Sequence, residues 1–422
     1  PNKSSRLPAK TPQGGMAKNA AHSAAAADAT PLSENGTSLY VHVPFCVSKC
    51  SYCDFNSWEL HDGGALERTV DALLAETRIR AKGLRPQTVF LGGGTPSLLP
   101  PNLVGKLLDG LHDATDFRNS SLETTLEANP ESFDFETARA AFGGGVTRAS
   151  IGVQSLRPDV LRAYDRVHTA SAARQAFFTA RKAGFQRINV DLIYSFPGQN
   201  SEEWFEDLEE VMAWEPEHLS CYELSYEPGT PLTKAKDSGL IKAENRDVAL
   251  QLFNETRARC ESRGLSAYEV SNFAMPGEEC LHNLAGWRSL DCVGVGAGAV
   301  TWQGGVRRKN LAKPEDWIRS VESGAEQAHV ERPGATTRMF DCFLMGLRLC
   351  KEGVSISRVF QQTGLHPKEV WAKELESLFG ESLLLEEGDF IRATPRGLRI
   401  LDSVLGQLLP AGSGGEFTSE QV

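Results

Sequence analysis

The chain has 422 residues, of which 41% are hydrophobic, and its formal net charge is -11. A chain of this length can bury a large core, and we expect one large globular domain and one smaller one. The negative charge argues against a nucleic-acid-binding protein, because such proteins need a basic surface to displace counterions from phosphates. No apolar run approaches the roughly 18 residues of a membrane-spanning helix, so no membrane span is expected.

Residues 1–36 are rich in Ala, Ser, Lys and Pro and contain almost no large apolar residues. Such a composition cannot form a core, so this tail and the Gly/Ser-rich residues 410–422 are predicted to be disordered. Basic residues outnumber acidic ones in the first tail, which has no apolar segment of the secretory type. Two interpretations stay open: an untargeted tail on a cytoplasmic protein, or the remnant of a transit peptide that directs the chain to an organelle matrix or stroma.

A short apolar run from residue 38 predicts a strand that leads into a loop with three cysteines. Cys46, Cys50 and Cys53 follow the pattern C-x3-C-x2-C. Thiolates at this spacing can converge on one metal centre, and three of them on a cubane cluster leave one iron open to a small chelating molecule. A zinc loop is the alternative, but a closed zinc site needs a fourth Cys or His, and Asp54 and Phe55 follow here. Disulfides are disfavoured, because nine cysteines are an odd number and six of them are scattered singly.

Strand and helix patterns alternate along the rest of the first 270 residues. We expect helices over residues 65–82, 170–183, 201–214 and 245–263, and further strands over residues 88–91, 122–128, 147–153, 187–193, 218–224 and 266–271. Strands that alternate with helices form βαβ units and a parallel sheet. The six strands before residue 266 are too few for a closed eight-stranded barrel, so we predict an α/β fold with a partial (β/α)6 TIM-like barrel.

Polar residues or glycines stand at the predicted ends of these strands: the cysteines, Gly92-Gly93-Gly94-Thr95, Glu127, Gln154, Asp191 and Glu223. Because the chemistry of parallel α/β folds gathers at the carboxyl ends of the strands, we expect these residues to converge on one opening. Taken singly, each is also consistent with a solvated loop residue, and Asp191 with a helix N-cap. The glycine run has neither the Lys-Ser/Thr of a Walker sequence nor the spacing of a dinucleotide-binding turn, but its bare backbone lets a ligand approach closely.

The cysteine array, together with His42-Val-Pro-Phe-Cys46 and Tyr52-Cys53, resembles the cluster-binding loop of the radical S-adenosylmethionine (SAM) superfamily. It looks most like the branch that contains the oxygen-independent coproporphyrinogen dehydrogenases and the HemW-like haem chaperones, and the resemblance extends over residues 38–409. This implies a radical SAM barrel, a [4Fe-4S] cluster on the three cysteines with SAM on its open iron, and an electron donor such as a flavodoxin or a ferredoxin. The residues that match SAM-contacting positions of the coproporphyrinogen dehydrogenases are Tyr40, Tyr52, Gly93, Gly94, Thr95, Glu127, Gln154, Arg166 and Asp191.

The segment Cys280-Leu-His282-Asn-Leu-Ala-Gly286-Trp287 precedes a glycine-rich run and resembles the haem-binding sequence H-N-x-x-Y-W of HemW-like proteins. The resemblance implies that His282 is an axial ligand of haem iron, a usual role of imidazole. The alternative is a surface histidine bonded to a neighbouring carbonyl. Gly286 stands where the family has Tyr, so an aromatic ring that could contact the porphyrin is absent.

Residues 334–409 follow a different pattern. Helices are expected over residues 336–349, 355–363 and 367–379, followed by a hairpin of residues 383–386 and 390–393 and a last helix, which predicts a small winged-helix-like α+β domain. Basic and acidic residues are nearly balanced there, so we expect a lid or docking module and not a DNA-binding domain. The predicted organisation is a barrel over residues 37–270, a barrel extension with the haem-binding segment over residues 271–333, and this domain over residues 334–409.

Two functions are compatible with these features. In the first, the chain is a haem chaperone that binds a [4Fe-4S] cluster, SAM and haem and delivers haem to acceptor proteins. In the second, it is an oxygen-independent coproporphyrinogen III dehydrogenase, which decarboxylates propionate side chains through a radical. The first is favoured, because the dehydrogenases follow the third cysteine with x-Cys and carry an ordered amino-terminal extension, whereas this chain has Asp54-Phe55 and a low-complexity tail. Whether the chain is also an enzyme stays open.

Overall fold

The structure is a computed structural model, and it describes residues 32–325 and 327–409. Most of the predicted amino-terminal tail and the whole of the predicted carboxyl-terminal tail lie outside the described residues. Among the described residues, no helix combines the length and the apolar character that crossing a membrane requires.

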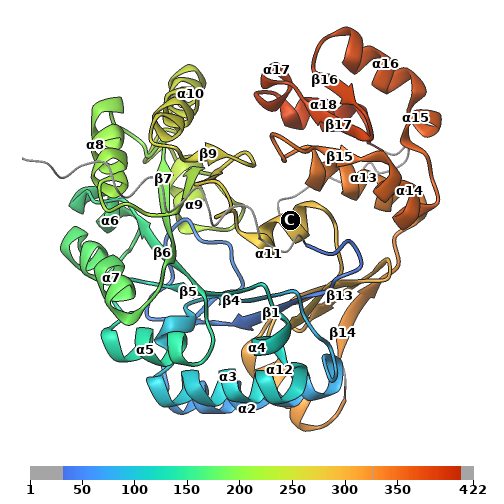
Figure 1. Cartoon of the computed structure of the whole chain (residues 1–422). Coiled ribbons are helices and arrows are strands. Elements are labelled where there is room, and N and C mark those ends of the chain that lie inside the picture. Colours follow the sequence, from blue (N-terminus) through green and yellow to red (C-terminus); the bar gives the residue numbers. More distant parts are fainter. Residues whose placement is uncertain (1–31, 326, 410–422) are drawn as a thin grey trace, which may run out of the picture. The chain divides into compact units, whose positions relative to one another are not determined.

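A 12-stranded sheet forms the centre of the barrel part (Figure 1). In spatial order its strands are β14 (Ala328–Glu331), β13 (Val306–Asn310), β12 (Val300–Gln303), β11 (Cys292–Val295), β1 (Ser38–Val43), β4 (Thr88–Gly93), β5 (Glu123–Ala128), β6 (Arg148–Gln154), β7 (Arg187–Tyr194), β8 (His218–Glu223), β10 (Asn272–Ala274) and β9 (Ser266–Ala267). The six strands from β1 to β8 in this order are all parallel to their neighbours. The predicted α/β fold with a partial six-stranded parallel barrel is therefore confirmed.

The sheet is wider than the sequence patterns predicted. β11 joins the free edge of β1 in parallel, and β12, β13 and β14 extend that edge as antiparallel strands. The prediction of one strand over residues 266–271 is wrong, because the chain turns there and forms the antiparallel pair β9 and β10. The turn is stabilised by the Glu269 side chain, whose Oε1 accepts hydrogen bonds from Ser271 N and Asn272 Nδ2.

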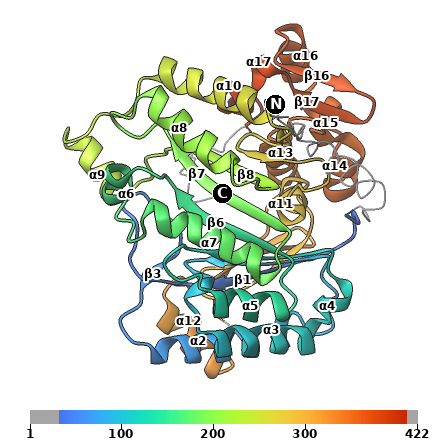
Figure 2. The same cartoon turned by 60° about the vertical axis from the view of Figure 1, so that its left-hand side comes forward.

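Helices cover the outer side of the curved sheet, whereas α11 lies on its inner side (Figures 1 and 2). The helices of this part are α2 (Gly64–Arg80), α3 (Pro101–Thr115), α4 (Phe117–Ser120), α5 (Phe135–Gly143), α6 (Pro158–Ala163), α7 (Ala170–Ala183), α8 (Ser201–Met212), α9 (Pro231–Asp237), α10 (Arg246–Ser262), α11 (Leu281–Trp287), α12 (Pro314–Glu322) and the 3-10 turn η1 (Pro96–Leu98). α7 illustrates their origin. Thr169 caps its amino end, and Ala173, Ala176, Phe177 and Ala180 recur at helical spacing on its buried face.

The carboxyl-terminal unit has its own hydrophobic core. It contains α13 (Ala335–Gly346), α14 (Ile356–Thr363), α15 (Pro367–Val370), α16 (Ala372–Gly380), α17 (Pro395–Leu398), α18 (Leu401–Gln407) and a sheet of β15 (Val354–Ser355), β17 (Phe390–Ala393) and β16 (Leu384–Glu387). The predicted hairpin is confirmed as the antiparallel pair β16 and β17. The single helix predicted over residues 367–379 is wrong, since the chain kinks at Trp371, whose buried ring packs edge-on against Phe343.

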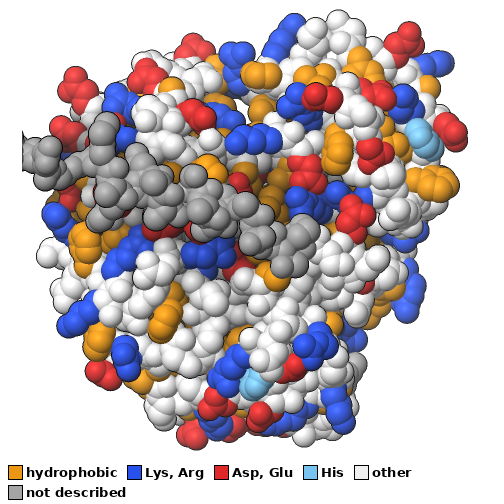
Figure 3. All heavy atoms as spheres, viewed as in Figure 1, with side chains coloured by type: hydrophobic (Ala, Val, Ile, Leu, Met, Phe, Trp, Pro, Cys, Tyr) orange, Lys and Arg blue, Asp and Glu red, His pale blue; other side chains and the backbone are white. Residues whose placement is uncertain are grey.

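The carboxyl-terminal unit contacts the barrel part beside α11. Arg288, at the end of α11, pairs with Glu352 at 2.6 Å, and Gln362 Nε2 donates to the Ser289 carbonyl oxygen at 3.0 Å. On the face shown in Figure 3, basic side chains are interspersed with acidic ones over both parts.

Candidate functional site

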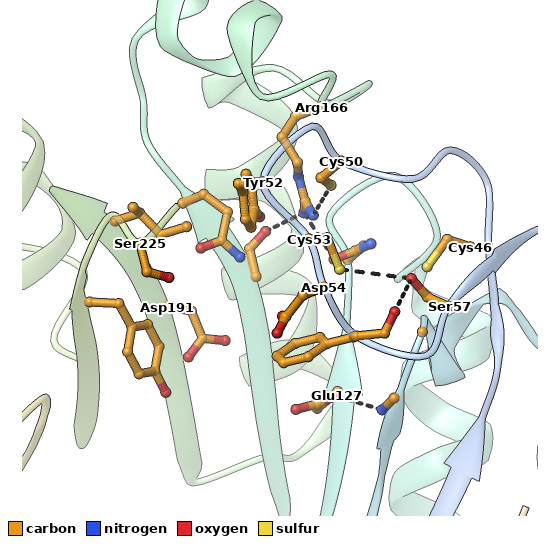
Figure 4. Close-up of a pocket in the computed structure, with 18 of the residues that line it drawn as sticks. Cys46, Cys50, Tyr52, Cys53, Asp54, Ser57, Glu127, Arg166, Asp191 and Ser225 are labelled. Carbon is orange, nitrogen blue, oxygen red and sulfur yellow. Dashed lines mark hydrogen bonds between the residues drawn. The ribbon is translucent and has the colours of Figure 1, made fainter. Parts of the chain in front are cut away.

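A cavity of about 580 Å³ opens at the carboxyl ends of the parallel strands (Figure 4). Most of the residues selected from the sequence line it, namely Cys46, Cys50, Tyr52, Cys53, Gly93, Gly94, Glu127, Gln154, Arg166, Asp191 and Glu223. They come from the cysteine loop and from β4, β5, β6, β7 and β8 or the segments that follow them. Residues that are remote in sequence are thus brought to one opening, as expected for the carboxyl edge of a parallel sheet.

The loop that carries the three cysteines is fastened to the barrel at several points. The short strands β2 (Phe45–Cys46) and β3 (Trp58–Glu59) pair in parallel and bracket it. Inside the loop, Ser51 Oγ donates to the Ala163 carbonyl oxygen at 2.7 Å. Near its end, Asn56 Nδ2 donates to two backbone carbonyl oxygens of the 297–312 region. These bonds hold the loop in one conformation without using the cysteine side chains.

His42 does not belong to the set of possible metal ligands. Its Nε2 bonds the Asn56 carbonyl oxygen at 2.9 Å, and its Nδ1 bonds the Tyr40 hydroxyl at 2.9 Å. Both ring nitrogens are therefore hydrogen-bonded within the protein, and His42 links β1 to the end of the cysteine loop at Asn56.

The three thiols line one cavity, and none of them is in a disulfide. Within the described residues, no three His, Cys, Asp or Glu side chains lie close enough to ligate a single metal ion. A [4Fe-4S] cubane binds each thiolate through a different iron, so its ligands stand farther apart than those of one zinc ion. The described residues thus contain no preformed single-ion site, and three thiols on one cavity suit a cluster that binds each thiolate through a different iron. Burial raises the pKa of Cys46 and raises that of Cys53 to about 11, so these thiols give up their protons when a metal binds.

The glycines at the end of β4 have a structural reason that sequence reasoning missed. A Cβ on Gly93, whose φ is +110°, would lie 2.5 Å from the His42 ring, and a Cβ on Gly94 would lie 2.7 Å from the Phe45 carbonyl oxygen. The space for these side chains is filled by β1 and the start of the cysteine loop. Both glycines still line the cavity, where their backbone is accessible to a ligand.

Two carboxylates face the cavity from β5 and β7, the strands on either side of β6. Glu127 Oε2 accepts a hydrogen bond from Gly93 N at 3.1 Å, and Asp191 accepts from Asn189 Nδ2 at 2.8 Å and Ser150 Oγ at 3.3 Å. Burial, reinforced by the charge of Asp191, raises the pKa of Glu127 to about 7. Burial also raises the pKa of Asp191. Asp191 lies inside β7 and not at a helix start, so the N-cap interpretation is wrong for this residue.

Gln154 and Arg166 complete the side of the cavity near the cysteines. Gln154 has a φ of +66° at a register shift between β6 and β7, an uncommon conformation for a residue with a side chain. Arg166 Nη1 donates to Cys50 Sγ at 3.5 Å, and its Nη2 donates to Asn129 Oδ1 at 2.9 Å. Arg166 thus connects the cysteine loop to β5 and β6 and places a fixed positive charge next to one thiol.

Tyr40 and Thr95 do not line this cavity. Tyr40 lies in β1, where its hydroxyl bonds His42 and its ring stacks on Phe90 at 6.3 Å between centroids. Thr95 Oγ1 accepts from Asn129 Nδ2 at 3.0 Å. In this structure both side chains lie behind the surface of the cavity. Tyr40 contacts His42 and Phe90, and Thr95 contacts Asn129, which itself lines the cavity.

His282 lies in a second cavity of about 500 Å³, which the 271–333 region forms with the carboxyl-terminal unit. Its Nδ1 bonds Thr88 Oγ1 at 2.9 Å, and its ring stacks on Phe90 at 5.0 Å between centroids. The bond goes to a buried threonine of β4 and not to a carbonyl, so the alternative of a surface histidine is wrong. Burial lowers the pKa of His282 to about 4, so the ring is neutral at physiological pH. The second cavity adjoins the first, because both are lined by Phe55, Tyr222 and Arg348.

A buried carboxylate holds the start of α11. Glu123 Oε2 accepts from Leu281 N and its Oε1 accepts from His282 N, both at 3.1 Å. Burial alone would raise the pKa of Glu123, but the positive charges of Arg148 and Arg187 and these backbone donors outweigh burial, and its pKa is lowered. An ionised residue of β5 therefore fixes the backbone that carries His282.

Sequence reasoning missed several residues that line the first cavity: Phe55, Ser57, Asn129, Tyr222, Ser225 and Arg348. Tyr222 precedes Glu223 at a predicted strand end, so the same strand-end rule indicates it. Phe55 stands two residues after the third cysteine. Arg348 has no such signal, because it comes from the carboxyl-terminal unit and reaches the cavity only through tertiary packing.

Comparisons with known proteins agree with this architecture. Residues 40–211 match the family model of the radical SAM superfamily, and residues 335–400 match that of the HemN C-terminal domain. Heme chaperone HemW of Mycobacterium tuberculosis is 34% identical over 389 residues, which cover 90% of this chain and 96% of the relative. Heme chaperone HemW of Escherichia coli is 34% identical over 378 residues, which cover 87% of this chain and 97% of the relative.

Two further proteins extend the comparison. The mouse protein named radical S-adenosyl methionine domain-containing protein 1, mitochondrial, is 34% identical over 390 residues, which cover 88% of this chain and 87% of the relative. The solved structure of Escherichia coli coproporphyrinogen III oxidase (HemN), a radical SAM enzyme, has a TM-score of 0.77, covers 89% of this chain and 90% of its own, and is 23% identical, which shows the same fold. By its sequence likeness along most of its length, this chain belongs to the HemW family of the radical SAM superfamily.

Proposed function

We propose that this chain is a haem chaperone that holds a [4Fe-4S] cluster on Cys46, Cys50 and Cys53, binds SAM in the first cavity and haem in the second, and delivers haem to acceptor proteins. The observation that carries the proposal is that the neutral, partly buried His282 lies in a cavity that adjoins the one with the three thiols. A ligand with an iron atom and a cluster with SAM can then be held side by side.

The first cavity offers complementary groups for each part of SAM. Glu127 and Asp191 are suited to the ammonium group or the ribose hydroxyls, and Arg166 is suited to the carboxylate. Gln154 and the backbone of Gly93 add neutral hydrogen-bonding groups. When bound, the cluster supplies an electron to SAM, which in turn calls for a reducing partner such as a flavodoxin or a ferredoxin.

In the second cavity, the hydrogen bonds of His282 favour the tautomer that can bind iron. Thr88 Oγ1 donates its proton to Ser38 Oγ at 2.8 Å, so it accepts the Nδ1 proton of His282. The lone pair is then on Nε2, and no residue of the described chain forms a hydrogen bond with that nitrogen in this structure. A hydrogen bond at one ring nitrogen that fixes the other as a ligand is a common feature of histidine metal ligands.

The acceptor protein and the compartment belong to the same proposal. The carboxyl-terminal unit and the 271–333 region both contribute residues to the second cavity, so release of haem to an acceptor involves both parts. Both compartments considered from the sequence, the cytoplasm and an organelle matrix or stroma, stay predictions, because residues 1–31 lie outside the described part of the chain.

The test is anaerobic reconstitution followed by haem titration. We expect about four irons and matching acid-labile sulfide per chain, lost on Cys50→Ala and kept on Cys221→Ala, since Cys221 is buried in β8. Haem added to the parent should give a shifted Soret band that His282→Ala loses while it keeps the iron-sulfur absorption. Equal haem binding by His282→Ala, or repeated turnover of coproporphyrinogen III to protoporphyrinogen, would contradict the chaperone proposal.

A further inference from the structure

The Arg348 side chain forms no ion pair among the described residues, although its charge favours the ionised form of the nearby Glu269. In the part of the chain that the structure describes, its Nε is buried without a hydrogen-bond acceptor. Its recorded neighbour is the Trp287 ring, with the guanidinium carbon 5.6 Å from the ring centroid. A buried polar group of this kind is usually satisfied by a partner, and an arginine fork fits a carboxylate through two parallel hydrogen bonds.

The two nearby arginines differ from Arg348. Arg288 binds Glu352 through its Nε and Nη2, and Arg257 donates to the Val270 carbonyl oxygen and to Cys350 Sγ. Both side chains therefore have structural roles. Arg348 lines both cavities and is the one Lys or Arg among the described residues that line the second.

We propose that Arg348 binds a carboxylate of the ligand in the second cavity, so that this cavity recognises a planar macrocycle with acidic side chains and not an iron centre alone. The inference rests on the proposed function and deepens it. Phe55 and Trp287 supply apolar ring surface in the same cavity, and His282 supplies the nitrogen for the metal. A ligand that is flat, apolar at its centre and carboxylated at its edge matches these three kinds of group.

Glu269 is the acidic residue that lines this cavity, and within the described residues it forms no ion pair with Arg348. Its Oε1 accepts from Ser271 N at 2.8 Å and from Asn272 Nδ2 at 2.6 Å, within its own turn. Burial raises the pKa of Glu269, against its hydrogen bonds and the charge of Arg348. Glu269 is therefore already hydrogen-bonded within its own turn, and an incoming carboxylate can pair with Arg348.

A comparison of the affinities for haem and for its dimethyl ester separates carboxylate binding by Arg348 from iron binding. The ester keeps the ring and the metal but lacks the carboxylates. We expect reconstituted parent protein to bind haem at least about tenfold more tightly than the ester, as for a hydrogen-bonded charge pair. Arg348→Gln should lose this preference by binding haem more weakly and the ester unchanged. Arg348→Lys, which keeps the charge but not the fork, should retain part of the preference.

Arg338→Gln is the matched control. Arg338 lies in α13, its Nε is also buried without a hydrogen bond, and it lines neither cavity, so this variant should keep the parent's preference. The inference is overturned if Arg348→Gln discriminates haem from the ester as the parent does, or if the variant loses SAM affinity instead. Should Arg348→Gln not fold, a preference of Arg348→Lys for haem over the ester that is smaller than the parent's would support the inference, and an unreduced preference would oppose it.

These outcomes separate this inference from the proposed function. If the parent binds haem through His282 but Arg348→Gln keeps the preference, only the role of Arg348 is wrong. If neither the parent nor His282→Ala alters the Soret band, the haem-binding function itself is wrong and this inference is overturned with it.

Discussion

Glu127 is a carboxylate that lines the first cavity and whose burial lowers the stability of the ligand-free protein when it is charged. Its pKa of about 7 lies above the ordinary value for glutamate because burial, and then the neighbouring Asp191, disfavour its charged form. A carboxyl group whose pKa is raised in the folded state binds more protons there than in the unfolded chain. Between the two pKa values its contribution to the free energy of unfolding therefore falls as pH rises.

The first prediction follows from that sign. Glu127→Gln should leave the stability of the SAM-free protein nearly unchanged at pH 5, where Glu127 is already protonated in the folded state. At pH 8 the substitution should stabilise it, because the cost of a buried charge is removed. Urea unfolding at both pH values measures this. Glu376→Gln, on an exposed position of α16, should change stability little at either pH; an equal effect of Glu127→Gln at pH 5 and pH 8 would rule out the raised pKa.

Gly286 gives a second prediction at this scale. It is exposed, lines the second cavity, and has no atom within 4 Å of the position a Cβ would take. A tyrosine can therefore be accommodated there, as in the family sequence. Gly286→Tyr should tighten haem binding by on the order of 1 kcal/mol through ring stacking. Haem titration of this variant beside Gly286→Ala, which adds no ring, tests it; a gain shared by both variants would mean that stacking is not the cause.

Among the elements, α11 depends most clearly on a distant part of the chain. It is a short helix with no side-chain cap of its own, and its first backbone N–H groups are satisfied by Glu123 of β5. Glu123 also pairs with Arg187 at 3.1 Å, and Arg148, which is 2% exposed, lies close enough to lower its pKa. The start of α11 is thus held by the ionised Glu123, whose charge also offsets those of Arg148 and Arg187.

The third prediction concerns this carboxylate. Glu123→Gln preserves its shape but removes the negative charge beside the buried Arg148 and leaves Arg187 with Glu278 alone, so the free energy of unfolding should drop by on the order of 3 kcal/mol. Haem binding should weaken as well, because the backbone at His282 loses its anchor. Glu278→Gln is the control, since Glu278 also binds Arg187 but is partly exposed, and its loss should cost about 1 kcal/mol or less. Similar losses for the two variants in urea unfolding would refute the central role of Glu123.

At the scale of the whole molecule, the second cavity is built by two units with separate cores. His282 and Trp287 come from the 271–333 region, whereas Met345 and Arg348 come from the carboxyl-terminal unit. Glu352 links the two, because it accepts hydrogen bonds from Arg288 of the first and from Arg358 of the second. Haem affinity should therefore depend on contacts that do not touch the ligand.

The fourth prediction tests this link. Glu352→Gln removes the negative charge between Arg288 and Arg358, so the two units should be held together less firmly and haem should bind severalfold more weakly. SAM binding to the reconstituted protein should change little, because the residues assigned to SAM lie in the barrel part. Lys368→Gln, which breaks the exposed Lys368–Glu386 pair inside the carboxyl-terminal unit, should leave both affinities unchanged. Calorimetric titration with each ligand measures the effect, and an unaltered haem affinity of Glu352→Gln would speak against it.

The sequence by itself determined the features that depend on local chemistry. The spacing of Cys46, Cys50 and Cys53 places three thiols in one loop, and the alternation of strands and helices predicts a parallel sheet with Glu127, Gln154 and Asp191 at one edge. These inferences succeed because side-chain spacing and hydrophobic periodicity act over a few residues. The hydrophobic periodicity was less informative for β9 to β14, because these strands have only two to five residues each.

Only the tertiary structure decided which distant residues share a surface. No local pattern indicates that Thr88 bonds His282, that Glu123 holds the start of α11, or that Arg348 reaches both cavities, since each contact joins segments more than 100 residues apart or two separately packed units. The same is true of Gly93, whose tight packing against His42 is visible only once β1 and β4 lie side by side. The physical reason is that burial and charge pairing depend on position in space, which the order of residues specifies only through the completed fold.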